Sequence, residues 1–428
     1  MTSNSSSTKA TSSAGLTPAI DIILAGSGTS AGIAAIALSQ AGFNVAYHMR
    51  EYKDDPDQDD WSSVVALSKA AVNMLTRLGI INDSTKSQPL ERMKLDQRYA
   101  QSVSGKLEFT DPNGLARVFS NTQLYKAVHD QLLKTKLTSL AAPIQSYENF
   151  EATLTDGSKV KARLCVDGSG RHSTLRKAAG INCKTDDYQQ DAIVTWVEHA
   201  KSHQDQALQF FTSTGPLALL PLPDASVSSA DTARTRSART RSALVWSQDR
   251  PRAKALLSVS PEMFIEVLSE EIGDCRGAIH TIGPRLSQPL QYLLADSFIA
   301  PGLVLIGDSA HIVHPLAGQG LNLTLRDIAQ LVDCLCDAKR LGLDWTSEIV
   351  LEPHSIERRA DASLTLALTH QLQSLFKPKN KLSQMIRSSA MHAANYAISR
   401  SERLGKSVLG QADQGIGLTP KLMQDLAE

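Results

Sequence analysis

The sequence lacks an excess of charge of either sign. Its 428 residues carry 44 Lys and Arg against 44 Asp and Glu, so the formal net charge is zero. A protein that attracts nucleic acid through its overall field needs a strongly positive balance. We therefore expect no nucleic-acid partner, and any recognition that depends on charge must be local.

Cysteine is scarce, and its spacing is uninformative. The five cysteines are odd in number and show no C-x-x-C pair, which argues against a zinc knuckle or a redox pair. Cys334 and Cys336 lie two residues apart on an expected helix and point to different faces, which favours core packing over a shared metal. We predict no metal site, and a reducing cytoplasmic environment fits these free thiols.

Long apolar runs are also missing. No stretch reaches the roughly 18 uncharged apolar residues that a membrane-spanning helix needs. Residues 1–18 are rich in Ser and Thr and lack the apolar run of a secretory signal, so we expect a disordered leader.

The segment from Leu375 to Gly410 mixes apolar residues with seven Lys and Arg, and Glu402 is its single acid. This pattern fits a basic amphipathic helix on an anionic membrane surface. It fits equally well a helix that packs on the protein and turns its basic face to solvent. The sequence leaves both readings open.

What is present begins with a nucleotide-binding pattern. We expect a strand over Ala19–Ala25, a helix over Ser30–Ala41 and a strand over Asn44–His48, which together have the size of a βαβ unit. The first strand and the helix are joined by a turn that fits G-x-G-x-x-G/A, formed by Gly26, Gly28 and Ala31. Such a turn lets the backbone approach a diphosphate, which the free N–H groups of the helix start then bind.

The second half of this pattern is weaker. A carboxylate that binds the ribose hydroxyls is expected about 20 residues after the first glycine. That position holds Met49, which cannot accept those hydrogen bonds. Glu51 is the candidate for this carboxylate if the second strand extends beyond His48.

A second stretch, "GDSAHIVHPLAGQGLNLTLRD", runs from Gly307 to Asp327. Asp308 follows an expected strand over Leu303–Ile306 and offers a carboxylate to sugar-like hydroxyls. Two further glycines loosen the loop that leads into a helix expected over Leu321–Leu335, and Asn322 lies in the first turn of that helix, where its side chain suits a cap or a ligand contact. No catalytic triad accompanies the motif.

These motifs resemble those of the class A flavin-dependent aromatic hydroxylases, which are p-hydroxybenzoate-hydroxylase-like proteins, and within them the ubiquinone-biosynthesis hydroxylase family. Members of that family carry a closely similar G-D-x-A-H-x-x-H-P-x-x-G-Q-G-x-N stretch followed by R-D. The likeness continues through "TGPLALLPLP", "LVWS" and "THQLQSLF", so it covers nearly all of the chain beyond the leader.

The resemblance implies an FAD-dependent monooxygenase that uses O2 to hydroxylate the ring of a polyprenylated phenol in ubiquinone biosynthesis. Its FAD would be bound non-covalently, and NAD(P)H or a protein electron donor would serve as reductant. Further implied partners are members of a ubiquinone-biosynthesis complex and, through the C-terminal region, the inner face of the membrane. The alternative is an FAD-impaired, non-catalytic paralogue that acts as a scaffold in the same complex.

The resemblance also assigns residues. Asp308 would bind the ribityl chain, Gly26, Gly28 and Ala31 would face the diphosphate, and the backbone from Pro315 to Asn322 would lie along the flavin ring. The residues expected at the cofactor are Gly26, Gly28, Ala31, Glu51, Ser169, Gly307, Asp308, Pro315, Gly318, Gln319, Gly320, Leu321 and Asn322. The environment of the reacting ring is expected at His314, Pro315 and Gly318. For His311 and His314 a structural role in packing the flavin loop is favoured over acid–base chemistry.

Four positions depart from the family pattern. Met49 replaces the ribose-binding Glu, and Ser63 and Thr122 or Gln123 stand where relatives carry Arg. In "CVDGSGRHSTLR" Ser169 takes the place of the usual Asp, and Asp167 is the alternative two positions earlier. Each lost charge-assisted hydrogen bond could cost about 1.5–3 kcal/mol of cofactor binding.

The expected fold class is α/β (α+β), with a discontinuous Rossmann-like FAD-binding lobe, a β-sheet substrate lobe and a helical C-terminus. We assign 19–85, 105–185 and 295–355 to the FAD-binding lobe, 86–104 and 186–294 to the substrate lobe, and 356–428 to the helical region. Residues 224–243 are expected to form a solvated Arg-rich loop, since "ARTRS" occurs there twice. Helices are also expected over Ser62–Leu78 and Asn121–Leu133.

Overall fold

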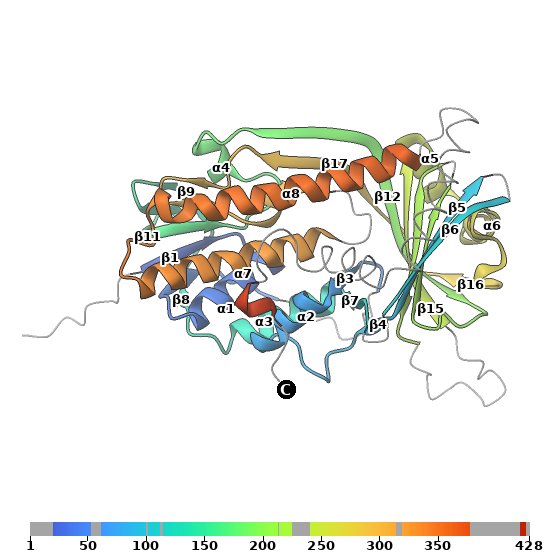
Figure 1. The fold of residues 1–428 in the computed structure, drawn as a ribbon, viewed down its shortest axis with the longest axis horizontal. Helices are drawn as coiled ribbons and strands as arrows, with labels where there is room; N and C mark the ends of the chain where they lie inside the picture. The colour runs from blue at the N-terminus through green and yellow to red at the C-terminus, as the bar shows by residue number, and fades with distance from the viewer. Residues whose placement is uncertain are drawn as a thin grey trace, which may run out of the picture.

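The computed structural model describes residues 20–52, 61–99, 102–111, 114–212, 214–224, 240–313, 319–376 and 420–424. These residues form two lobes that lie side by side, and two long strands, β12 (Cys183–His199) and β17 (Leu286–Ala295), run from one lobe into the other (Figure 1). The arrangement confirms the predicted α/β (α+β) fold class, with one lobe built on a largely parallel sheet and the other on a largely antiparallel one.

The first lobe, which we call the nucleotide lobe, is organised by parallel strands. Its sheet has the order β18-β19-β11-β1-β2-β8, and the hairpin of β9 and β10 continues from β11. The strands are β1 (Ile20–Ala25), β2 (Val45–Tyr47), β8 (Thr138–Ser139), β9 (Ile144–Glu148), β10 (Glu151–Leu154), β11 (Lys159–Asp167), β18 (Ile299–Ala300) and β19 (Leu303–Leu305). Because helices cover both faces, residues 22–25 of β1 form a continuous run of buried apolar side chains.

Helices enclose this sheet from two sides. Helices α1 (Thr29–Gln40), α3 (Asn121–Leu132) and α7 (Gln319–Arg340) share one core with one face of the sheet. The long helix α8 (Glu348–Phe376) packs on the other face through Ala362 and Leu366 (Figure 1). Small residues allow the close approach of α1, since a Cβ at Gly32 would lie 2.7 Å from Val128 Cγ1 of α3.

The second lobe, which we call the sheet lobe, has the strand order β20-β17-β12-β15-β14-β13-β5-β6, with β16 paired to β12. Its other strands are β5 (Arg92–Tyr99), β6 (Ser102–Thr110), β13 (Gln206–Phe211), β14 (Pro216–Leu222), β15 (Thr240–Asp249), β16 (Ile279–Ile282) and β20 (His311–Ile312). Helices α5 (Arg250–Ser258) and α6 (Pro261–Ile272) cover one face, where Trp246 and Phe264 pack edge to face at 5.9 Å.

Alternation along the strands separates two environments in this lobe. On β14, Leu217 and Leu219 are fully buried in the core under α5 and α6, whereas Ala218 and Leu220 are half-buried and point to the opposite face. That opposite face forms one side of the cavity described below.

The helix predicted over Ser62–Leu78 is wrong in its first half. Val64–Ser68 forms strand β3, which pairs with β7 (Ala116–Ser120), and β7 also pairs with β4 (Gln88–Leu90). The helix α2 extends from Lys69 to Arg77. It begins only at Lys69 because Ser68 caps its N-terminus by accepting a hydrogen bond from the Ala71 amide. The β-branched pair at the start of "VVALS" favours the strand, and its pairing partner lies some 50 residues away.

The other predicted elements agree with the structure to within a few residues at their starts, including the βαβ unit and the helices at α3 and α7. The remaining short elements are α4 (Thr174–Ala178) and single 3-10 turns at Gly273–Cys275, Gly307–Ser309 and Lys421–Met423. Within the described ranges, no helix is both long enough and apolar enough to cross a membrane.

Several predictions fall outside the described residues. These are the leader at 1–18, residues 225–239 of the Arg-rich loop predicted at 224–243, and residues 377–419 and 425–428 of the predicted C-terminal helical region. The loop prediction is wrong for residues 240–243, which form the start of β15 because they pair with β12. The domain boundaries predicted from the sequence stay predictions.

Candidate functional site

The turn between β1 and α1 is closed on one side and open on the other. Gly26 has a φ of +99°, and a Cβ there would lie 2.6 Å from the carbonyl oxygen of Gly168, so the residue must be glycine. Gly28 precedes the first turn of α1, and no atom lies within 4 Å of a Cβ built on it. Ala31 is fully buried against Gly168. The turn therefore packs tightly on the protein side and leaves room for a ligand above the helix start.

The loop after β11 is held by hydrogen bonds to a buried carboxylate. Asp167 is fully buried, and its Oδ1 accepts hydrogen bonds from the amide of Ser169 at 2.9 Å and its hydroxyl at 2.6 Å. Its Oδ2 accepts a hydrogen bond from the hydroxyl of Ser173. Both carboxylate oxygens are thus used within the loop. Asp167 shapes the loop, and Ser169, which is exposed, is the residue that a ligand can reach.

The turn after β19 brings a carboxylate into a cavity. Gly307 has a φ of +59°, and its amide donates a hydrogen bond to Asp327 Oδ2 at 3.0 Å. The next residue, Asp308, lies open to the cavity between the lobes. The surrounding walls desolvate its carboxylate and raise its pKa, and His311 and Arg171 partly offset that rise.

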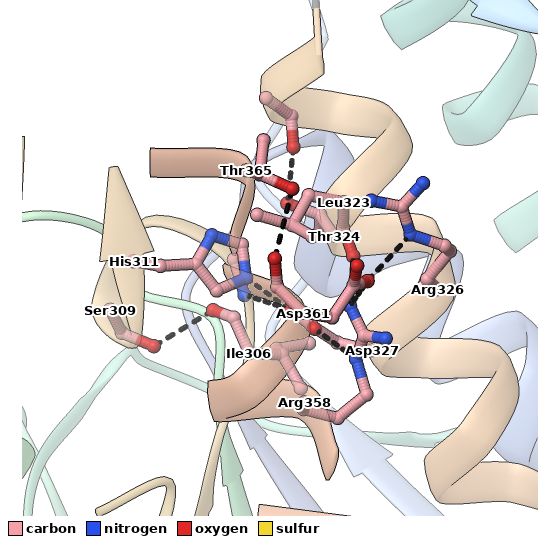
Figure 2. A network of polar contacts seen from close by, with 12 residues as sticks. Ile306, Ser309, His311, Leu323, Thr324, Arg326, Asp327, Arg358, Asp361 and Thr365 are labelled. Atoms are coloured by element: carbon pink, nitrogen blue, oxygen red, sulfur yellow. Dashed lines mark hydrogen bonds and ion pairs between the residues drawn. The ribbon is translucent and has the colours of Figure 1, made fainter. Parts of the chain in front are cut away.

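A buried network of ion pairs supports this turn from behind (Figure 2). Asp327 lies between His311 Nε2 at 2.6 Å and Arg358 Nε at 2.8 Å, and the side chains of all three are at most 3% exposed. Asp361 is 2.8 Å from Arg358 and 2.9 Å from Arg326. Burial alone would raise the pKa of Asp327, but His311 and Arg358 outweigh it and hold that pKa below its usual range.

This network joins α7 and α8 to the strand that follows Asp308. His311 donates to Asp327 and is 2% exposed, so its position is set by a structural contact. The network also explains the R-D pair at the end of the Gly307–Asp327 motif, since both residues take part in it.

The start of α7 is tied to the neighbouring sheet. Asn322 is 2% exposed, accepts a hydrogen bond from the amide of Ser68 at 2.9 Å and donates one to the carbonyl of Ala66 at 2.8 Å. Its side chain therefore binds β3. Gly320 lines the cavity, and no atom lies within 4 Å of a Cβ built on it. Gln319, Gly320 and Leu321 form the first turn of α7.

The structure does not place the remaining predicted residues at these turns. Glu51 is exposed, four positions beyond the end of β2 at Tyr47. Met49 is half-buried and packs against the core of the nucleotide lobe. His314, Pro315 and Gly318, which were expected around the reacting ring, lie outside the described residues.

A cavity of about 290 Å³ lies between the lobes. The nucleotide lobe, the neighbouring β3–β7 region and the start of β20 contribute a polar side, which consists chiefly of Ser62, Ser63, Asn121, Arg171, Asp308, His311 and Gly320. The sheet lobe contributes a mostly apolar side, which includes Met93, Val194, Leu208, Ala218, Leu220, Leu244, Val245, Pro289 and Leu290. One end of the cavity thus suits hydroxyl-bearing groups and the other suits an apolar molecule.

The turns that carry the predicted residues end neighbouring parallel strands. β1 pairs with β11 and β11 with β19, so their carboxyl ends share one edge of the sheet. A Cβ on Gly307 would lie 3.6 Å from Ser30 Oγ at the start of α1. Ligands of open α/β sheets bind outside such carboxyl ends.

The sequence profile of a family described as an FAD binding domain matches residues 19–369. The chain belongs to this family. Its members' cofactor suits the geometry above, because two glycine positions leave open space and a free carboxylate faces the cavity.

Curated relatives agree with this membership. The chain is 34% identical over 372 residues to the ubiquinone hydroxylase UbiL of Rhodospirillum rubrum, a match that covers 83% of this chain and 81% of that protein. It is 28% identical over 352 residues to the 3-demethoxyubiquinol 3-hydroxylase of Escherichia coli, covering 80% and 86%.

Solved structures show the same fold at low identity. The p-nitrophenol 4-monooxygenase PnpA from Pseudomonas putida superposes with a TM-score of 0.69 at 16% identity, covering 94% of this chain and 99% of that one. Taken with the family and the relatives, the chain is an FAD-dependent monooxygenase of the class A flavin hydroxylase type, as the sequence predicted.

Proposed function

We propose that this FAD-binding family member hydroxylates the aromatic ring of a polyprenylated phenol in ubiquinone biosynthesis. The relatives named for ubiquinone hydroxylation support this substrate class. The observation that carries it is the cavity, in which Asp308 faces an apolar wall formed by strands of the sheet lobe. Such a wall accepts a neutral, apolar ring and its prenyl chain.

The chain's own residues supply binding, orientation and a dry site. FAD, when bound, supplies the activation of O2. Asp308 accepts hydrogen bonds from ribityl hydroxyls, and the open space at Gly28 and Gly320 admits backbone contact with the cofactor. The apolar side chains of β12, β14 and β15 that line the cavity would exclude water and hold the phenol there. NAD(P)H or a protein donor serves as reductant.

We further propose how the protein meets a lipid substrate. A polyprenylated phenol resides in a membrane, so the enzyme acts in the cytoplasm at the inner membrane face, in contact with other members of a ubiquinone-biosynthesis complex. The basic sequence between Leu375 and Gly410 supports contact with anionic lipid.

The test combines cofactor binding with complementation. Purified protein is titrated with FAD, and wild type and Asp308→Ala are expressed in cells that lack a ubiquinone ring hydroxylase. We expect a flavin spectrum, rescue by wild type and no rescue by Asp308→Ala. Colourless protein that co-purifies with pathway members would favour the scaffold alternative. FAD binding without rescue of any ring-hydroxylation deficiency would reject the substrate class.

A further inference from the structure

Arg171 is held in the loop between β11 and α4 at the edge of the cavity. The carbonyl of Arg171 accepts a hydrogen bond from Arg176 at 3.0 Å, and Arg176 is itself buried and bonded to the carbonyl of Ser309 at 2.7 Å. The Ser173 amide closes the loop by donating to the carbonyl of Gly170 at 3.0 Å. The backbone that carries Arg171 is therefore fixed on both sides.

This loop lies between the two turns that face the cofactor. A Cβ at Gly26 would lie 2.9 Å from the Cα of Ser169, two residues before Arg171. At the other end, the charge of Arg171 is close enough to Asp308 to lower the pKa of that carboxyl. Because β11 lies between β1 and β19, the loop that carries Arg171 lies between the β1–α1 turn and Asp308, and Arg171 and Asp308 line the same cavity.

Arg171 differs in charge from the other described residues around the cavity. Among the described residues that line it, Arg171 is the sole Lys or Arg. Ser63 and Asn121 line the same space, and their side chains form a neutral hydrogen bond of 2.7 Å with each other. An anionic group that enters between the two turns therefore finds its positive partner in Arg171.

We propose that Arg171 binds the diphosphate of FAD, at the phosphate nearer the flavin, and supplies there a positive charge that no other described residue lining the cavity carries. The proposal rests on FAD binding, which family membership establishes. The ribityl chain joins that phosphate to the flavin, and Asp308 is the ribityl partner. A cation between the Gly28 turn and Asp308 therefore lies where this phosphate has to pass. A guanidinium suits this group, since it donates two parallel hydrogen bonds to phosphate oxygens.

The phosphate makes the proposal testable with three ligands. FAD and FMN carry the phosphate next to the ribityl chain, whereas riboflavin carries the same ring and ribityl chain without it. Loss of Arg171 should weaken FAD and FMN and spare riboflavin. One charge-assisted hydrogen bond corresponds to roughly a 10- to 100-fold change in Kd.

The dissociation constants of FAD, FMN and riboflavin are measured by flavin fluorescence for full-length wild type, Arg171→Gln and Arg171→Lys. Lys177→Gln, an exposed cation on α4, is the control for the loss of one positive charge. We expect about 10- to 100-fold weaker FAD and FMN binding in Arg171→Gln, an intermediate loss in Arg171→Lys, and riboflavin unchanged within twofold. Lys177→Gln should match wild type.

Equal FAD affinity in wild type and Arg171→Gln would overturn the proposal, as would an equal loss for riboflavin. A change confined to the KM of NAD(P)H would assign Arg171 to the reductant instead. If Arg171→Gln does not fold, Arg171→Lys carries the test, because the Kd for FAD must still rise relative to the Kd for riboflavin. Wild type that binds no flavin would reject FAD binding itself, which is a separate failure.

Discussion

The two walls of the cavity are built in opposite ways. On the nucleotide lobe the shape depends on backbone geometry and buried charge, as at Gly26, Gly307 and the Asp327 network. On the sheet lobe it depends on the size of alternate side chains along β12 and β14. The first wall tolerates few residue types and leaves a readable motif. The second accepts any set of apolar residues of suitable volume, so the substrate it selects is free to vary.

Removing the charge that supports the first wall should have the largest effect. Asp327→Ala removes the carboxylate that pairs with His311 and with Nε of Arg358, and it removes the acceptor of the Gly307 amide. Breaking a buried pair in this way costs about 3–5 kcal/mol. We expect a matching loss in the free energy of unfolding by urea and loss of FAD binding. Asp337→Asn, on the exposed side of the same helix, should change neither.

Two glycines in one turn should fail differently, which separates packing from ligand contact. Gly26→Ala places a Cβ 2.6 Å from the Gly168 carbonyl at a φ of +99°, so the apoprotein should lose about 1–3 kcal/mol of stability. Gly28→Ala meets no atom within 4 Å, so the apoprotein should keep its thermal midpoint while FAD affinity falls. The same loss of stability in both variants would mean that Gly28 also serves packing.

A larger side chain on the sheet-lobe wall should weaken substrate binding and leave FAD binding unchanged. Ala218→Phe projects from β14 into the cavity, so we expect roughly tenfold higher KM for the phenol and an unchanged Kd for FAD. Ala218→Ser, which is close to alanine in size, is the control. A Kd for FAD that rises as steeply as the KM would show that the two walls are not independent.

The smallest effect expected is a pH dependence of FAD binding. The Asp308 carboxyl group accepts charge-assisted hydrogen bonds at both oxygens only when it is ionised, and its raised pKa means that protonation begins at a higher pH than for an ordinary Asp. Affinity for FAD should therefore be fully present well above that pKa and decline as the pH falls through it. Asp308→Asn should flatten the profile measured by titration between pH 4 and 8, whereas an equally steep profile would place the titrating group elsewhere.

The contrast between the walls also explains what the sequence could predict. The β1–α1 turn and the Gly307–Asp308 turn were predictable, because each demands glycine at a φ that other residues avoid. Strand β3 was predicted as helix because its partner β7 lies far away in the sequence. Pairing across such a distance leaves no local trace.

Buried partnerships were equally hard to foresee. Asp167 was a candidate ligand, yet Ser169 and Ser173 occupy both of its oxygens. The R-D pair alone does not reveal the Asp327 network, because the partners on α8, Arg358 and Asp361, come from beyond the motif. Arg171 lies two residues after Ser169, and no periodicity of the sequence singles it out.

The strands that cross between the lobes restrict how the molecule can work. β12 pairs with β17 from Cys183 at the nucleotide lobe to Val194 inside the sheet lobe, and β20, three residues after Asp308, pairs with the end of β17. Swinging the lobes apart would break this hydrogen-bonded ladder, which no small ligand compensates. The phenol must therefore enter, and the product leave, through local rearrangement of loops. The turnover rate should respond to loop substitutions more than to solvent viscosity.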